Sequence, residues 1–173
     1  MSWKDPQLFV TDCDNKPSPI HMLPISNYTR PWMKPQGGIW TSTYTGEETG
    51  SAWVQWAQVH LLKNEWHSYL LRPRRDAKVY VIDGRQDLER LLDRFEHPDS
   101  PRPTRMIDFE KMALHYDALH LTEKGEEETR WGAWGTLYNW DVESTLWFRW
   151  VFEEVENLGV QSYSLDHAAQ SVP

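Results

Sequence analysis

Glu143 is the residue of this sequence whose surroundings most favour a chemical role. It stands between Trp140 and Trp147 in a segment with strand character. An ionised carboxylate among aromatic side chains is costly unless it is paired or functional. Two interpretations follow: Glu143 serves a binding or catalytic site, or it forms an ion pair with Arg149 at the end of the strand.

A second stretch, Lys34–Tyr44, joins a glycine pair to an aromatic strand. The glycines permit close backbone approach. Trp40 has the shape to stack on a planar ligand or to pack in the core. Lys34 and Arg30 have the charge to attract a phosphate group, although a surface location explains them equally well. We expect the ligand of this protein to lie along this stretch.

Common nucleotide and metal signatures are absent from the sequence, which has no Walker loop, no strand-linked GxGxxG, no HExxH and no CxxC. His115 and His120 lie five residues apart, but no third ligand is evident, so a structural pair is expected and no metal. Cys13 is the single cysteine, and no base near it in the sequence marks it as a nucleophile.

Alternating and helical patterns predict an α+β fold that positions these residues. We expect strands at 7–13, 37–45, 67–71, 77–83, 118–122 and 145–152, and helices at 52–62, 86–95 and 107–116. The five prolines between residues 14 and 35 favour a long extended loop over the domain. The charged and glycine-rich segment 123–135 is expected to be a loop.

Two of these helices have a predicted apolar face. In helix 86–95 the face consists of Leu88, Leu91, Leu92 and Phe95, which follow the helical period. In helix 52–62, with Ser51 as its N-cap, the face consists of Ala52, Trp56, Val59 and Leu62.

The length and the charge of the chain limit the classes of protein to which it can belong. A chain of 173 residues with 39% hydrophobic content fits one domain, which we place at 1–160, followed by a flexible tail at 161–173. The net charge of −8 disfavours a nucleic-acid coat protein or a membrane-surface binder. One cysteine, no leader-like N-terminus and no apolar segment of spanning length favour a cytoplasmic protein without membrane contact.

The order of residues from Gly38 to Trp56 resembles the central strand and helix of ADP-ribosyltransferases. The match consists of Gly-Ile-Trp-Thr-Ser at 38–42 and Ser-Ala-Trp-Val-Gln-Trp at 51–56. Most of the chain also resembles uncharacterised bacterial and phage proteins that share Lys-Pro-x-Gly-Leu-Trp, Ile-Asp-Trp…Tyr-Asp-Gly and Gly-Trp-Asp-Cys segments. Their counterparts here are 34–40, 107–118 and 139–143, in the same order. If the chain is phage-encoded, its place is the host cytoplasm.

The resemblance implies a split β-sheet sandwich with flanking helices that binds NAD as a substrate and transfers, hydrolyses or sequesters its ADP-ribosyl group. In that superfamily a later strand supplies a glutamate, whose counterpart is Glu143. The implied cofactor contacts are Ser42 and Thr11 at the ribose, Trp40 and Tyr44 at the nicotinamide, Gly38 at the carboxamide, and Arg30 or Lys34 at the phosphates. The acceptor is a protein, a nucleic acid or another group that the sequence does not identify.

One position departs from the family pattern. Many such transferases carry a His or Arg on the opening strand, where this chain has Thr11. Three explanations remain open. Thr11 makes a weaker contact with the cofactor, or His21 or Arg30 reaches the cofactor from the loop, or the site binds the cofactor without catalysis.

A non-enzymatic interaction protein is the alternative from another class. Such a phage or bacterial inhibitor would use an acidic, tryptophan-rich surface, in one version as a DNA mimic. Its acidic residues would form an exposed array, whereas the nucleotide hypothesis requires a pocket lined by Trp40, Ser42 and Glu143.

Overall fold

The computed structural model describes residues 5–28, 30, 33–131 and 137–165, and these form an α+β fold, as expected. The strands are β1 (Gln7–Thr11), β2 (Ile39–Thr43), β3 (Glu65–Pro73), β4 (Val79–Ile82), β5 (Ala118–Leu121), β6 (Ser144–Trp147) and β7 (Phe152–Ser162). The helices are α1 (Ala52–His60), α2 (Arg85–Phe95), α3 (Phe109–Met112) and α4 (Glu123–Thr129), with a 3-10 turn at Pro19–His21.

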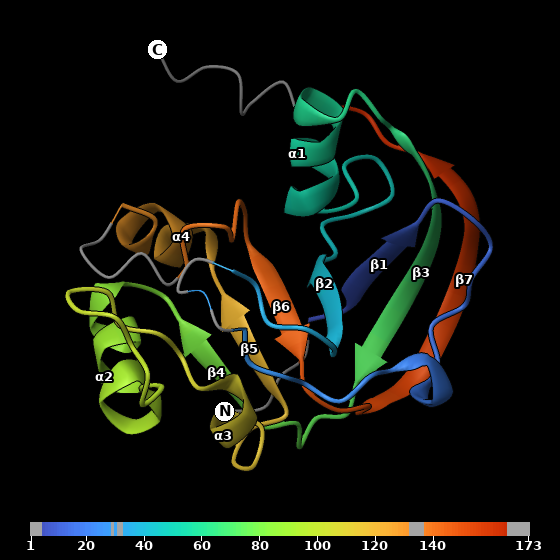
Figure 1. Ribbon diagram of the computed structural model, residues 1–173. Helices are drawn as coiled ribbons and strands as arrows, with labels where there is room; N and C mark the ends of the chain where they lie inside the picture. The colour runs from blue at the N-terminus through green and yellow to red at the C-terminus, as the bar shows by residue number, and fades with distance from the viewer. Residues whose placement is uncertain (1–4, 29, 31–32, 132–136, 166–173) are drawn as a thin grey trace.

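All seven strands belong to one mixed sheet in the order β4-β5-β6-β2-β1-β3-β7. Only β4 and β5 pair in parallel; the other neighbours are antiparallel. The joint between β2 and β1 is short, with Gln7 opposite Thr43 and Leu8 opposite Ser42. Beyond these pairs the two parts of the sheet separate, and Figure 1 shows β4, β5 and β6 on one side of β2 and the longer β1, β3 and β7 on the other.

A buried hydrogen-bonded chain ties the two parts together at this joint. Trp147 in β6 donates through Nε1 to Thr41 Oγ1 in β2 over 2.8 Å. Thr41 Oγ1 in turn donates to Gln7 Oε1 in β1 over 2.7 Å. Because buried polar atoms are costly without partners, each member of this chain depends on the others.

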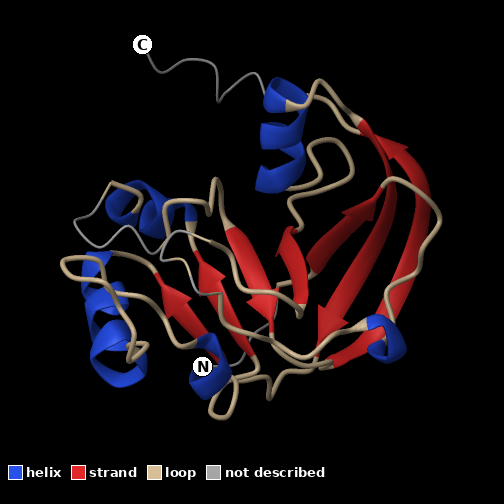
Figure 2. Ribbon diagram, in the orientation of Figure 1, coloured by secondary structure: helices blue, strands red, loops and turns tan. Residues whose placement is uncertain are grey.

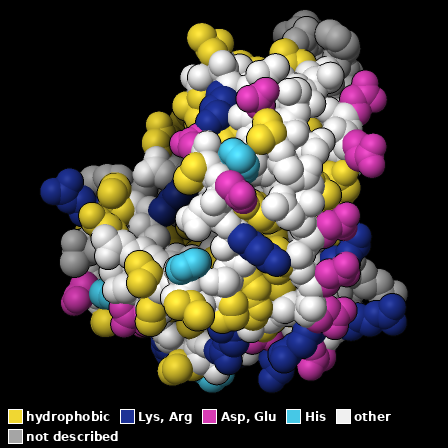
Figure 3. Space-filling model, turned by 90° about the vertical axis from the view of Figure 1, so that its right-hand side faces the viewer, with side chains coloured by type: hydrophobic (Ala, Val, Ile, Leu, Met, Phe, Trp, Pro, Cys, Tyr) yellow, Lys and Arg dark blue, Asp and Glu magenta, His cyan; other side chains and the backbone are white. Residues whose placement is uncertain are grey.

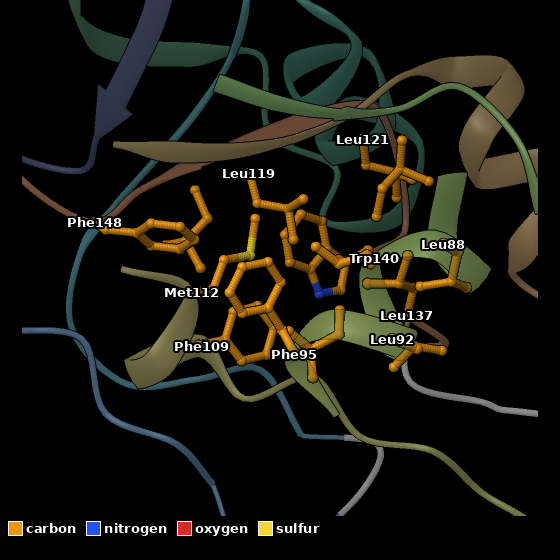
Figure 4. Packing of buried hydrophobic residues seen from close by; sticks show 14 residues of the cluster. Leu88, Leu92, Phe95, Phe109, Met112, Leu119, Leu121, Leu137, Trp140 and Phe148 are labelled. Atoms are coloured by element: carbon orange, nitrogen blue, oxygen red, sulfur yellow. The ribbon is translucent and has the colours of Figure 1, made fainter. Parts of the chain in front are cut away.

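The largest apolar cluster lies between α2, α3 and the β4-β5-β6 part of the sheet. Figure 4 shows α2 and α3 side chains meeting β5 and the ring of Trp140. All four residues of the predicted α2 face are buried, which confirms that helix. Figure 2 shows α2, α3 and α4 beside β4, β5 and β6, whereas α1 stands apart from them, above β2 and β1.

Helix α1 begins as expected, but it buries a different face. Ser51 caps it by accepting a hydrogen bond from the Val54 amide. The residues buried beneath it are Val54 and Ala57, whereas Val59 is 57% exposed and Leu62 is 89% exposed. The predicted face was wrong at Val59 and Leu62, whereas Trp56, which the prediction included, packs against the cluster beneath α1. Trp53, which the prediction left out, packs on the same cluster against Trp66 of β3, so the buried face is centred on Val54 and Ala57 instead. None of the described helices is long and apolar enough to cross a membrane.

Two segments differ from the predicted elements. Residues 123–129 form helix α4 rather than a loop, because Thr122 caps the segment and Glu123 and Glu126 stabilise its first turn. The strand expected at 145–152 is two strands, with β6 ending at Trp147 and β7 beginning at Phe152. β7 runs past residue 160, the boundary set for the domain, and Tyr163 beyond it is only 3% exposed. Residues 166–173 of the predicted tail lie outside the described part of the chain.

The proline-rich segment between β1 and β2 crosses the molecule and is fixed at two places. Asn27 accepts a hydrogen bond from the Phe109 amide and donates one to Asp108, which attaches the segment to the start of α3. At the other end, Gly37 and Gly38 have φ of +76° and +68°. A Cβ at Gly38 would lie 2.5 Å from the Trp147 carbonyl oxygen, so this close approach requires glycine.

Candidate functional site

A cleft of about 460 Å³ opens where β1 and β2 separate. Its walls are the two strands, the loop before the 3-10 turn, the start of α1 and the residues that lead into β6. The lining side chains include Phe9, Lys16, His21, Lys34, Trp40, Ser42, Trp53, Asp141 and Ser144. A concave site of this size with aromatic walls and a few polar groups is typical of small-molecule binding.

Trp40 forms an aromatic wall of the cleft, and its ring contacts two neighbouring side chains. The rings of Trp40 and Trp140 meet in a T-shaped contact, with their centroids 4.6 Å apart and their planes at 71°. On the ring lies the Lys34 ammonium, 5.1 Å from the centroid. Lys34 Nζ is also 3.9 Å from Asp141 Oδ2.

Glu143 lies immediately before β6, next to the end of β2, and β2 holds its carboxylate. Ser42 Oγ donates to Oε2 over 2.5 Å, and Thr43 Oγ1 donates to Oε1 over 2.8 Å. The Thr43 amide adds bonds of 3.2 and 3.1 Å to the two oxygens. The side chain of Glu143 is only 11% exposed. Burial raises the pKa of Glu143, and the hydrogen bonds from Ser42 and Thr43 oppose this rise.

His120 in β5 lies behind this carboxylate. Its Nδ1 is 2.8 Å from Thr145 Oγ1 and 3.5 Å from Glu143 Oε1. Burial lowers the pKa of His120 to about 4. The imidazole is therefore neutral at pH 7, and its contact with Glu143 is not an ion pair at that pH.

The bond between Ser42 and Glu143 joins two stretches about a hundred residues apart that were expected to meet. Ser42, Trp40, Gly38 and Lys34 all line the cleft, whereas Glu143 does not line it and contacts it only through its bond with Ser42. Of the residues offered for the opening strand and loop, His21 lines the cleft, near Ser18.

Three predicted contacts lie elsewhere. Thr11 ends β1 opposite His67 and does not line the cleft. Arg30 is exposed and also outside it. Tyr44 packs with the apolar cluster beneath α1. β2 ends at Thr43, before Tyr44, so the strand alternation that would place Tyr44 beside Trp40 does not extend to it.

The ion pair between Glu143 and Arg149, the alternative interpretation of this glutamate, does not form. Arg149 instead lies with its Nε 3.2 Å from Asp117 Oδ1. The two residues are separated because β6 runs between them, from Ser144 to Trp147. Hydrogen bonds from neutral groups therefore satisfy Glu143 in place of a cation.

Sequence reasoning missed the roles of Thr43, Asp141 and His120. His120 had a usable signal, since it is the one polar residue in the apolar strand Ala118–Leu121, and a buried polar residue needs a partner. The pair expected with His115 does not form, because His115 lies instead near the Phe95 ring. Within the described residues, no group of three or more His, Cys, Asp or Glu is arranged to hold a metal ion.

Glu143 itself lines a different cavity, of about 500 Å³, between α1 and α4. Asp141, Val142 and Ser51 line both cavities. The carboxylate and the residues beside it therefore separate two spaces that are each large enough for a small group.

Comparison with known proteins gives no relative: no protein-family model, no curated protein and no solved structure matches the chain.

Proposed function

We propose that the cleft binds NAD or a related ADP-ribosyl nucleotide, and that the fold is an ADP-ribosyltransferase-like split sheet. The observation that carries this proposal is the bond from Ser42, which lines the cleft together with Trp40, to the Glu143 carboxylate behind it. The separation of β1 from β2 agrees with a sheet split in two parts.

The chemistry of NAD cleavage accounts for these residue types. When the C1′–N bond breaks, its electron pair leaves with nicotinamide and positive charge develops on the ribose. A carboxylate fixed against the ribose stabilises that charge in the transition state more than in the ground state. Glu143 is suited to this task because Ser42 and Thr43 fix its position before any ligand binds.

The remaining cleft residues fit the other parts of the nucleotide. The Trp40 ring has the geometry to stack on nicotinamide, and the backbone of Gly38, which lines the cleft, is placed to bond its carboxamide. Lys16 and His21 bring positive or protonatable groups into the cleft of an acidic protein, which favours a diphosphate. His21 replaces Thr11 and Arg30 in this assignment, because neither of those residues lines the cleft.

A transfer reaction also needs space for an acceptor. In the proposed reaction the acceptor bonds to C1′ as nicotinamide leaves, and the proton of the acceptor passes to a base such as Glu143. The cavity between α1 and α4 gives water or another acceptor access to the side of Glu143 away from the cleft.

Calorimetric titration with NAD tests the binding part of this proposal. Wild-type protein is expected to bind NAD. Trp40→Leu should weaken binding by about tenfold, because a stacking surface and a cation–π contact are lost together. Trp131→Leu is the matched control, since Trp131 is exposed and lies outside the cleft. Absence of NAD binding to the wild type would refute the proposal, whereas binding without turnover would assign a sequestering role.

A further inference from the structure

The ring of Trp40 already has a cation on its face, supplied by the protein itself. Lys34 Nζ lies 5.1 Å from the ring centroid, within the range of a cation–π contact. The T-shaped contact with Trp140 restricts the orientation of the ring. The Trp40 face is therefore a preformed surface for positive charge.

Asp141 supplies the negative charge beside that surface. Its Oδ2 is 3.9 Å from Lys34 Nζ, and its Oδ1 is 3.6 Å from an amino nitrogen of Arg130. Arg130 is in turn bonded to Glu126, at 2.9 Å. Asp141 therefore has charge to offer a second cation, since Arg130 is shared with another carboxylate.

Lys34 is held loosely in this position. Its side chain is 41% exposed, and its distance from Asp141 is long for an ion pair. Burial lowers the pKa of Lys34, so its ammonium is partly stripped of water where it lies. A long flexible side chain in such a place can return its charge to solvent when another cation arrives.

We propose that the face of Trp40 and the carboxylate of Asp141 form a subsite for a permanently charged aromatic ring, which Lys34 occupies until the ligand displaces it. The nature of the ring rests on the proposed function, in which the ligand is NAD. The pyridinium ring of NAD carries a positive charge, whereas the dihydropyridine ring of the reduced nucleotide is neutral. The subsite therefore selects the charged form, and Lys34 competes with the ligand at the ring instead of holding its phosphates.

Two small probes test the subsite without the rest of the nucleotide. Calorimetry or ligand-observed NMR would compare 1-methylnicotinamide, which carries a permanent charge, with neutral nicotinamide. We expect the charged probe to bind about fivefold more tightly to the wild type, as an accessible cation–π contact allows. Lys34→Met keeps most of the stem and removes the charge, so it should strengthen binding of 1-methylnicotinamide about threefold.

Two further variants complete the test. Trp40→Leu should abolish the preference for the charged probe. Lys63→Met is the matched control, because Lys63 lies 4.0 Å from the Trp66 ring and pairs with Asp12 outside the cleft. That variant should bind both probes as the wild type does.

Three results would overturn the subsite: equal binding of the two probes, binding of neither, or weaker binding of 1-methylnicotinamide to Lys34→Met. These results are separate from a failure of the proposed function. If the protein prefers 1-methylnicotinamide but does not bind NAD, the subsite is supported and the proposal of NAD binding is refuted. If it binds NAD but does not prefer the charged probe, NAD binding is supported and the subsite is refuted.

Discussion

Glu143 and His120 show how a buried polar pair is satisfied inside the sheet. The sequence indicated that Glu143 needs a partner, and it placed Ser42 near it. It could not show that Thr43 would supply both an amide and a hydroxyl, because that depends on where β2 ends relative to β6. His120 lies opposite Thr145 because of the register between β5 and β6, and local sequence patterns do not determine that register.

The buried imidazole makes stability depend on pH. An unfolded histidine binds a proton near pH 6.5, whereas His120 in the folded protein does so near pH 4. Between these values the unfolded state holds more protons, so the free energy of unfolding falls as the pH falls. The shift corresponds to about 3 kcal/mol at most. Glu143 acts in the opposite sense, because its raised pKa favours the folded state as the pH falls.

His120→Gln isolates the histidine contribution. Urea unfolding at intervals from pH 7 to pH 4 should show a shallower loss of stability for this variant than for the wild type. The comparison uses the pH slope, so a constant loss from altered packing does not affect it. Identical slopes would show that His120 does not carry the pH dependence.

At the scale of elements, the spacing of apolar residues predicted the buried face of a helix correctly where the sequence offers a single apolar face. It failed in α1, where tryptophans on more than one side of the helix made the choice of face ambiguous. Helix α2 was predicted with its buried face because four apolar residues repeat at helical spacing. Helix α4 was missed because its charged sequence has no such face. Gly125 within it lies against the Ile82 carbonyl, where a Cβ would come within 2.1 Å, so that glycine serves packing rather than a loop.

The two valines of α1 test which face is buried. Val54→Ala should lower the free energy of unfolding by about 2 kcal/mol, because Val54 is fully buried. Val59→Ala should change it by less than about 0.5 kcal/mol, since Val59 is exposed. Chemical denaturation of both variants measures the difference. A larger loss of unfolding free energy for Val59→Ala than for Val54→Ala would show that the face predicted from the sequence is the buried one.

At the scale of the whole molecule, the short joint between β1 and β2 both opens the cleft and connects the two parts of the sheet. No local pattern predicts this, because the joint depends on pairing between strands that are distant in the chain. The sequence identified α+β composition and most of the elements. The order of strands in the sheet required the structure.

Thr41→Val breaks the chain of bonds at that joint. It leaves Trp147 Nε1 and Gln7 Oε1 without this partner in a buried place, so it should cost about 2–4 kcal/mol of unfolding free energy. Thr45→Val is the control, because Thr45 is exposed and its hydroxyl bonds to that of Thr49 at the surface. Equal stability of both variants, measured by urea unfolding, would show that this chain does not hold the two parts together.

The distribution of charge bears on the alternative of an inhibitor that mimics DNA. On the face of Figure 3, acidic side chains gather along one margin with Lys and Arg beside them. On β7, Glu154 and Glu156 both approach Arg72, at 3.1 and 3.7 Å. A mimic of DNA needs a continuous exposed array of negative charge. The margin in Figure 3 carries both acidic and basic side chains, so it does not provide such an array.

Release of nicotinamide from NAD is the most direct measurement of the central claim. Wild-type protein should release nicotinamide at a rate proportional to protein concentration. Glu143→Gln should lower that rate by about a hundredfold or more, while its affinity for NAD stays within about threefold of wild type. Glu153→Gln, which alters an exposed glutamate on β7, should behave as the wild type. Release by Glu143→Gln at the wild-type rate, or no binding and no release by any of the three proteins, would contradict the claim.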